Sequence, residues 1–336
     1  MLNTNPFGTG ALESVSDPRT LHHEDLTTGV PLLTGGIIYS SENIEHQHKV
    51  GICTAIHLTQ NRGKANGKKY SADFQYLLQK KYYDLNWYEG SSILNALKVG
   101  KNIGFLPVEL FSVTEADRFG SYQAYIAKLQ AIPDSEIERL KALCVDKIAG
   151  YAQVDVSDPQ KIAKAIEESE AGILCRYGCG DTWWIPSWLP KDINPLRRPA
   201  VDTSGHAIGM TYFDYTSKYM QKLANTWGID WNVQGNADID YSTYPMYEAW
   251  TILRETPVIP PFIFTRDLFF GSRGDDVKML QKWLNKRGYT VTSNGQETSF
   301  YGLKTASAVV RLQKDNGLIP SIGYFGPRTR ALVNNS

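Results

Sequence analysis

One cysteine stands where the sequence passes from a glycine-containing loop into an apolar run. Cys53 follows Gly51, and Ala55, Ile56 and Leu58 continue the run, so the pattern predicts a helix that begins at Cys53. A thiol at a helix N-terminus faces unpaired backbone N–H groups and the positive end of the helix dipole. Both favour the thiolate over the thiol, which makes Cys53 a candidate nucleophile.

Three polar side chains elsewhere in the chain could complete a thiol-based site. Gln47, six residues before Cys53, offers an amide donor where the oxyanion of an attacked carbonyl would develop. A thiolate also needs a base, and the base needs a group that fixes its tautomer and orientation. His206, in a small-residue turn before an apolar run, and Asn225, just before a tryptophan, are the candidates for these two roles.

Each of these residues also has a plainer interpretation. A lone cysteine is commonly a small buried hydrophobe, and a lone histidine beside apolar residues is commonly part of the core. His57 is the nearest rival base, because it lies four residues after Cys53 and so on the same helical face. A helix would direct its side chain away from a cleft, so we interpret His57 as structural.

The order and spacing of these residues resemble the papain-like cysteine peptidases. The motifs of that family are Gln-x5-Cys, a Gly-x-Cys turn that opens the central helix, His-Ala before a strand, and Asn-Ser-Trp-Gly. The last motif here reads Asn225-Thr226-Trp227-Gly228, and the resemblance runs from about residue 35 to about residue 247. His206 and Asn225 follow Cys53 by 153 and 172 residues. This is slightly more than the roughly 130–150 residues of the family, and loop insertions would account for the excess.

The resemblance implies an α+β, two-lobed papain-like fold, in which a helical lobe carries Cys53 and a β lobe carries His206 and Asn225. It also implies that Asn225 orients His206 and that Gln47 contributes to the oxyanion hole. Periodicity and turn residues add the elements themselves. We expect helices over 74–83, 133–150 and 159–170, strands over 171–177, 206–213 and 219–225, and an exposed polar loop over 60–71.

The substrate contacts are carried over from the same resemblance. Gly90 and Ser91 lie where the family places a glycine-rich cleft wall, against which the backbone of a bound peptide pairs. The cysteine and the second glycine of that family motif are missing here. Gly205, next to His206, and Trp227 are also expected beside the substrate, with Trp227 shielding the hydrogen bond of the histidine from water.

Two further segments of this region leave their roles open. Residues 1–34 are rich in Thr, Gly, Ser and Asp, which predicts an extended arm that could lie over the catalytic domain. The arm is too short and too poor in helical pattern to be the long helical inhibitory propeptide of the family. Trp183, Trp184 and Trp188 could line the cleft, or they could pack a long insertion before the histidine.

The composition of the chain restricts the classes of protein to which it could belong. The 336 residues include 35 basic and 35 acidic side chains. This balance favours a neutral monomer without a nucleic-acid partner. No stretch approaches the eighteen apolar residues of a membrane span, and the first thirty residues carry no ordinary export signal.

The four cysteines are too few for a disulfide scaffold, which suggests a reducing cytosol. Cys175-x3-Cys179 could be half a metal site, but no paired Cys/His cluster completes it. Packing or an incidental thiol pair is the better interpretation, and no metal or other cofactor is expected.

We expect a papain-like domain over 35–255, and the pattern of the sequence differs beyond it. Three prolines within 257–261 predict an extended linker over 256–266, followed by a separate domain over 267–336. There an aromatic-Gly-x2-Thr theme followed by an apolar helix occurs twice, at 301–305 and at 325–329. Such an internal repeat predicts a compact three-helix unit.

This last domain resembles the peptidoglycan-binding domain at the ends of many cell-wall hydrolases. The resemblance lies in its Gly-Asp-Asp-Val-x2-Leu-Gln, aromatic-Gly-x2-Thr and Leu-Gln-x3-Gly-Leu elements. A purely structural three-helix appendage is the alternative. Wall affinity would come from a shallow surface with polar and aromatic groups, for which Tyr301 and Tyr324 are the candidates.

Together the two parts imply that bacterial peptidoglycan is the partner. The expected activity is endolysin-like hydrolysis of an amide bond in the stem peptide or its crossbridge. Such an enzyme of a bacteriophage would be made in the host cytosol and would reach the wall on release, or be carried on the virion. The alternatives are a protease that processes virion proteins and docks to a wall, and an inactive wall-binding structural protein.

Overall fold

The computed structural model describes residues 8–15, 20–27, 45–183, 195–214, 220–253, 263–291 and 297–334. The chain divides into two compact units between Pro257 and Val258. Within the described residues, no helix is long and apolar enough to cross a membrane. Trp184, Trp188 and most of the predicted linker lie outside the described residues.

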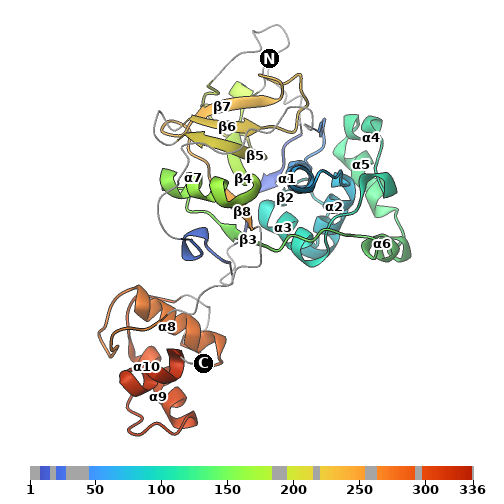
Figure 1. Cartoon of the computed structure of the whole chain (residues 1–336). Coiled ribbons are helices and arrows are strands. Elements are labelled where there is room, and N and C mark those ends of the chain that lie inside the picture. Colours follow the sequence, from blue (N-terminus) through green and yellow to red (C-terminus); the bar gives the residue numbers. More distant parts are fainter. Residues whose placement is uncertain are drawn as a thin grey trace. The chain divides into compact units, whose positions relative to one another are not determined.

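One lobe of the larger unit is helical and contains α1 (Figure 1). Its helices are α1 (Cys53–Asn66), α2 (Ala72–Gln79), α3 (Ile93–Asn102), α4 (Glu115–Phe119), α5 (Tyr122–Gln130) and α6 (Asp134–Lys141), with a π-helical turn over Lys80–Asp84. The hydroxyls of Ser71 and Ser92 accept backbone N–H groups at the starts of α2 and α3, which fixes where these helices begin. Ile56 of α1 packs into a core with Phe74 and Tyr125.

Two predicted boundaries in this lobe are wrong. The expected loop over 60–71 is helical in its first half, because α1 continues to Asn66 and ends at Gly67 in the left-handed conformation. The polar residues of this stretch predict exposure, yet part of it is buried. The helix expected over 133–150 is also shorter, since α6 ends at Lys141 and the chain then turns toward the sheet.

The other lobe is a six-stranded sheet in the order β3-β8-β4-β5-β6-β7, with antiparallel pairing throughout. The strands are β3 (Gly150–Gln153), β4 (Ser169–Cys179), β5 (Ser204–Asp214), β6 (Met220–Ala224), β7 (Asn236–Asp240) and β8 (Glu248–Leu253). Helix α7 (Pro159–Glu168) crosses one face of the sheet (Figure 1) and packs against β4 and β5. The two central strands, β4 and β5, therefore pack against α7. Strand β5 carries the predicted base.

The described cysteines are all free thiols. Cys175 and Cys179 lie in β4, where both side chains are buried in the core of the sheet lobe. Trp183 is buried in the same core, and its ring stacks on Trp231 at 6.0 Å between centroids. These three residues therefore pack the lobe, as the plainer of the two interpretations predicted.

A separate apolar cluster joins the two lobes. It brings Cys53 and Leu58 of α1 together with Leu174 of β4, Ala207 of β5 and Trp250 of β8. All five side chains are almost completely buried. The start of α1 is thereby fixed against the middle of the sheet, which is where a nucleophile on one lobe and a base on the other can meet.

A buried ion pair fixes the loop that leads to Gln47. Arg118 of α4 binds Asp73 of α2 through both ends of its guanidinium, at 3.1 and 2.9 Å. The same guanidinium donates to Glu45 at 2.6 Å and to the carbonyl of His46 at 3.2 Å. Bidentate geometry of this kind specifies orientation as well as attraction, so the loop has a defined path over the helical lobe.

The smaller unit contains α8 (Asp275–Lys286), α9 (Leu303–Asp315) and α10 (Pro327–Asn334), as the repeat predicted. They enclose a core of their own that includes Leu280, Val309 and Phe325. The repeat has a physical basis in two equivalent glutamine contacts. Gln281 of α8 donates to the carbonyl of Phe300 and to the hydroxyl of Thr305.

The second contact of this kind is made by Gln313 of α9. Its amide donates to the carbonyl of Tyr324 at 2.7 Å and to the hydroxyl of Thr329 at 2.9 Å. In each half, therefore, a glutamine from one helix holds the turn that starts the next helix. The threonine of the aromatic-Gly-x2-Thr theme is needed to receive that bond.

Candidate active site

The nucleophile candidate lies at the N-terminus of α1 and touches the opposite lobe. Cys53 is the first residue of the helix, and its sulfur accepts the backbone N–H of Ala207 at 3.4 Å. Ala207 follows His206 in β5, so the base candidate is the next residue along the strand that the thiol contacts. The predicted His-Ala pair thus positions both the base and a donor to the sulfur.

The hydrogen bonds around His206 assign a role to each ring nitrogen. Nε2 lies 2.7 Å from Oδ1 of Asn225, and the same oxygen accepts the backbone N–H of Thr226 at 2.7 Å. An amide oxygen can only accept, so Nε2 carries the proton and Nδ1 is left as the basic nitrogen. Within the described residues Nδ1 has no hydrogen-bond partner, which leaves it available to take a proton from a thiol.

Trp227 covers the imidazole on one side. Its ring stacks on that of His206 at 4.6 Å between centroids with 23° between the planes. Both side chains are buried. The structure thus places the predicted Trp227 directly against the ring of His206.

Gln47 is held so that its amide nitrogen faces the cleft. Its backbone N–H donates to the carbonyl of Thr226 at 2.8 Å, and its side-chain oxygen accepts the hydroxyl of Thr226. The side-chain nitrogen donates to the carbonyl of Gly8 at 2.6 Å. A peptide carbonyl is therefore already bound by the donor that the sequence assigned to the oxyanion. The hydroxyl at position 226 fixes this orientation.

One described part of the N-terminal arm lies in the cleft, whereas residues 20–27 lie against β3 and α7. We call residues 8–14 the cleft segment. Gly10 donates to the carbonyl of Gly205 at 3.1 Å, and its own carbonyl accepts the backbone N–H of Ser91 at 2.8 Å. Strand β1 (Ala11–Leu12) then pairs in parallel with β2 (Ser91–Ser92). The segment thus bridges the wall at Ser91 and the wall beside His206.

Further bonds hold both ends of the cleft segment. At its start Gly8 donates to the carbonyl of His48 at 2.7 Å, and its carbonyl also accepts the indole N–H of Trp227 at 3.1 Å. At its other end Ser14 accepts the backbone N–H of Leu94 and donates its own N–H to Glu248. Residues 8–14 of the predicted arm therefore cover the site directly, and they do so in an extended conformation.

The backbone of the cleft segment lies close to the backbone of the cleft wall. A Cβ added to Gly10 would lie 2.8 Å from the carbonyl oxygen of Gly51 and 2.8 Å from the Cα of Gly90. Gly90 itself has φ +91°, a conformation that favours glycine. Glycines on the segment and on the cleft wall therefore let the two chains approach at a distance that a side chain would prevent.

Burial shifts the pKa of both members of the candidate pair. Desolvation raises the pKa of the Cys53 thiol to about 11, although backbone N–H groups, including those of Ala207 and Gly10, lower it in part. Desolvation also lowers the pKa of His206 to about 4, against a smaller opposite effect of the bond to Asn225. Burial therefore favours a neutral thiol and a neutral imidazole in the covered site, and opposes the expected thiolate.

The site residues predicted from sequence come together in one place, whereas the rival base does not join them. His57 is buried in α1 and faces Gly209 of β5, and burial lowers its pKa well below its usual value. The cleft segment was missed because its contacts are made by backbone atoms. The signal available was the spacing of Gly8 and Gly10, which matches alternate residues of an extended chain.

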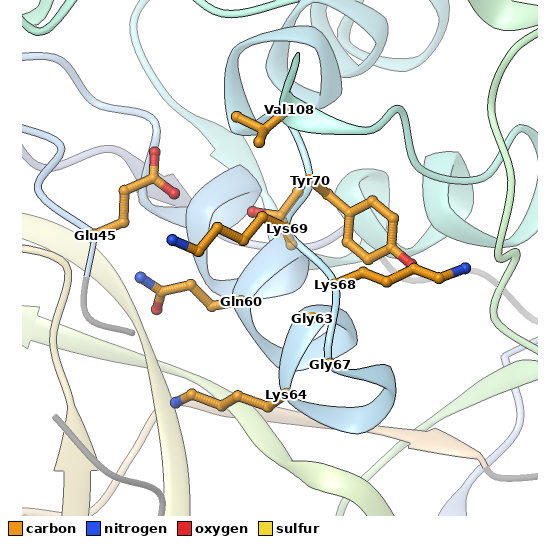
Figure 2. A pocket seen from close by; sticks show the side chains of 10 residues that line it. Glu45, Gln60, Gly63, Lys64, Gly67, Lys68, Lys69, Tyr70 and Val108 are labelled. Carbon is orange, nitrogen blue, oxygen red and sulfur yellow. The ribbon is translucent and has the colours of Figure 1, made fainter. Parts of the chain in front are cut away.

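A cavity of about 400 Å³ lies elsewhere in the larger unit (Figure 2). Glu45, Gln60 and Lys69 lie around it, with Tyr70 and Val108 further along its wall. At 1.5 Å per helical residue, its lining residues on α1 begin roughly 10 Å along the helix from the nucleophile. This cavity is therefore separate from the candidate catalytic residues.

Comparison with solved structures identifies the fold of the larger unit. Xylellain, a cysteine protease from Xylella fastidiosa, is similar with a TM-score of 0.56 at 17% sequence identity, over 75% of this chain and 98% of that one. A recombinant stem bromelain precursor is similar with a TM-score of 0.49 at 16% sequence identity, over 74% of this chain and 78% of that one. The digestive procathepsin L 3 of Tenebrio molitor is similar with a TM-score of 0.42 at 12% sequence identity, over 69% of this chain and 76% of that one. The predicted two-lobed papain-like fold is confirmed.

The smaller unit is identified by sequence. Residues 273–333 match the family described as "Putative peptidoglycan binding domain". A search of curated proteins finds no match to the chain. The chain therefore combines a papain-like fold with a C-terminal domain of the peptidoglycan-binding family, as the motifs indicated.

The cleft segment yields a first prediction. Replacing Gly10 by valine should displace the segment, because the new side chain would meet backbone atoms of the cleft wall. Overpacking of this kind costs about 1–3 kcal/mol, so alkylation of Cys53, which requires the segment to open, should become roughly tenfold faster or more. The measurement is the rate of iodoacetamide labelling at each cysteine by peptide mass spectrometry.

Two controls belong to this experiment. Cys144, partly exposed in the helical lobe, should be labelled at the same rate in both proteins and serves as the internal reference. Leu12 is 47% exposed, so Leu12→Ala should leave the labelling of Cys53 near that of the parent. An unchanged rate for Gly10→Val would show that the segment does not limit access to the thiol.

Proposed function

We propose that this chain is a cysteine peptidase that hydrolyses an amide bond of peptidoglycan, in the stem peptide or its crossbridge. The observation that carries the proposal is the peptide backbone in the cleft. A carbonyl of the cleft segment is bound by the predicted oxyanion donor, in a site that also contains Cys53, His206 and Asn225. The cleft is thus shaped to hold an extended peptide against a thiol.

In the proposed mechanism the cleft segment first leaves, since it occupies the path of the substrate. Admission of water and substrate lowers the desolvation that keeps the pair neutral, and the thiol proton passes to Nδ1 of His206. The Cys53 sulfur attacks the carbonyl carbon of the substrate. The side-chain amide of Gln47 and the backbone N–H of Cys53 stabilise the resulting oxyanion.

Collapse of the tetrahedral intermediate then breaks the amide bond. The imidazolium of His206 gives its proton to the leaving amine, and a thioester remains on Cys53. A water molecule that gives a proton to His206 attacks the thioester, and the protonated histidine returns the proton to the sulfur as the acid product leaves. Asn225 holds the ring in one orientation throughout, because Nε2 keeps its proton and its acceptor.

The substrate assignment is supported by the tail. A peptidoglycan-binding domain would hold the head beside its substrate and raise the rate without any change in the catalytic residues. A head that cuts peptide bonds and a tail that binds the wall suit an endolysin of bacteriophage type, which acts on the wall after release. The extended peptide in the cleft equally suits a second candidate, a peptidase for protein substrates whose tail only docks it.

Cys53→Ala tests the assignment of the nucleophile. It should abolish clearing of purified cell walls in zymograms while the protein unfolds at the same temperature as the parent, because only the attacking sulfur is lost. Release of new amino and carboxyl termini from soluble fragments, measured by mass spectrometry, would identify the bond. Clearing by the alanine variant would overturn the mechanism, and cleavage of casein without clearing by the parent would favour the second candidate.

The role of Gln47 leads to a further prediction. Gln47→Ala should lower kcat by roughly 10²–10³ with a smaller change in KM, because the lost donor acts on charge that develops in the transition state. Asn225→Ala should lower kcat less, since Trp227 still packs against His206. Both are measured on a soluble peptide under conditions where chemistry limits the rate.

Thr226→Ser is the matched control, because serine keeps the hydroxyl that orients Gln47. This variant should retain a kcat close to that of the parent, whereas Thr226→Val should lose part of it. If Gln47→Ala retains full kcat, Gln47 has no part in binding the oxyanion.

Separation of the two units gives a prediction about what each unit contributes to activity. A chain that ends near Thr256 should cleave a soluble peptide about as fast as the full chain, because the larger unit has its own cores. On intact wall at low enzyme concentration it should be slower, since the tail no longer holds it there. Turbidity loss of a wall suspension and peptide hydrolysis are measured side by side. Equal rates on wall would remove the tail from substrate targeting.

A further inference from the structure

A turn in the smaller unit presents two adjacent phenylalanines to solvent. Phe269 and Phe270 are 54% and 58% exposed. The turn is nevertheless well held, because the backbone N–H of Ser272 donates to the carbonyl of Phe269 at 2.9 Å and the Ser272 hydroxyl accepts the N–H of Phe269 at 3.0 Å. Gly271 also donates to the carbonyl of Tyr301 at 3.0 Å, which fastens the turn to the unit.

Each phenylalanine has a ring partner from another part of the unit. Phe269 lies beside Tyr324, with 6.3 Å between centroids, and Phe270 lies beside Phe300 at 6.2 Å. Tyr324 is 39% exposed. The four rings, which we call the aromatic strip, therefore join the turn to the segments that lead into α9 and α10.

Charged groups border the strip at both ends. The guanidinium of Arg273 lies 4.6 Å from the centroid of Phe300. At the other end the hydroxyl of Tyr324 donates to Asp267, which also binds Arg330. The strip is thus an uncharged aromatic surface with hydrogen-bonding groups at its edges.

The strip is distinct from the core that holds the unit together. Tyr301, which the sequence offered as a wall-binding residue, is completely buried, and its hydroxyl donates to the carbonyl of Gly323 at 2.8 Å. That prediction is wrong, because the repeat places Tyr301 among the core residues. Tyr324, the other candidate, does belong to the exposed strip.

The positions of Phe269 and Phe270 in the sequence also distinguish the aromatic strip from the matched part of the unit. The family match begins at residue 273, so Phe269 and Phe270 precede it. Half of the strip is therefore contributed by residues outside the matched range. Exposed aromatic surface on a turn that its own hydrogen bonds hold is typical of a binding surface.

We propose that the aromatic strip binds the sugar rings of the glycan strands of peptidoglycan, which deepens the proposed function and rests on it. Aromatic faces pack against the C–H faces of pyranose rings, while hydroxyl and acetamido groups reach polar groups at the edges. Asp267 and Arg273 are placed to receive them. The stem peptides are the poorer match for the ring faces themselves, because ionised groups lose hydration over uncharged rings without gaining a partner there.

The test uses the full chain carrying Cys53→Ala, so that the wall is bound but not digested. Binding to purified peptidoglycan is measured by co-sedimentation over a range of protein concentrations. Phe269→Ser combined with Phe270→Ser should weaken binding at least tenfold, and Tyr324→Ala should weaken it by a smaller factor. Ile319→Ser is the matched control, because Ile319 is 80% exposed but has no ring to stack, and its binding should equal that of the parent.

Competition identifies the part of the wall that is bound. Soluble chitotetraose should displace the parent from the wall, whereas a synthetic stem peptide at the same concentration should not. Displacement by the peptide alone, or full binding by the double phenylalanine variant while the parent binds, would overturn the glycan assignment and leave the proposed function intact. Failure of the parent to bind any wall would overturn the targeting role of the tail itself. Matching unfolding temperatures of all variants show that the unit remains folded.

Discussion

The contact between the start of α1 and the first half of β5 is the constraint on which the candidate site depends. The thiol of Cys53 and the imidazole of His206 belong to different lobes, so the candidate pair exists only where the lobes meet. The apolar cluster at the junction fixes the position of the helix end, and the N–H of Ala207 reaches the sulfur directly. Apolar burial is not directional, so the hydrogen bonds around the junction supply the precision that catalysis requires.

Those hydrogen bonds converge on one short motif. Asn225 receives Nε2 of His206, and Thr226 receives the side chain of Gln47, so neighbouring residues orient the base and the oxyanion donor. Trp227 then stacks on the imidazole. Three consecutive residues after β6 thus position the side chains of two residues, His206 and Gln47, that come from other parts of the sequence. An error in the path of this loop would disturb the candidate base and the candidate oxyanion donor at once.

The candidate site residues could be selected from the sequence because a thiol, a base, an orienting amide and an oxyanion donor restrict the residue types. The backbone contacts of Gly8 and Gly10 were not predictable in that way, since small residues carry no chemical signal of what they touch. The sequence also predicted the exposure of some side chains wrongly. The polar stretch after Cys53 remains helical to Asn66, and Tyr301 is buried although aromatic residues suit a wall-binding surface.

The cleft segment is part of the same covalent chain as the cleft that it fills. A group that is covalently joined to its own site is held at an effective concentration that does not depend on the concentration of the protein in solution. Contacts that would be far too weak to block the cleft as a free peptide can therefore block it here, and dilution does not release them. Each molecule carries its own blocking group in a fixed ratio of one to one, so only an event that acts on that molecule can open its cleft.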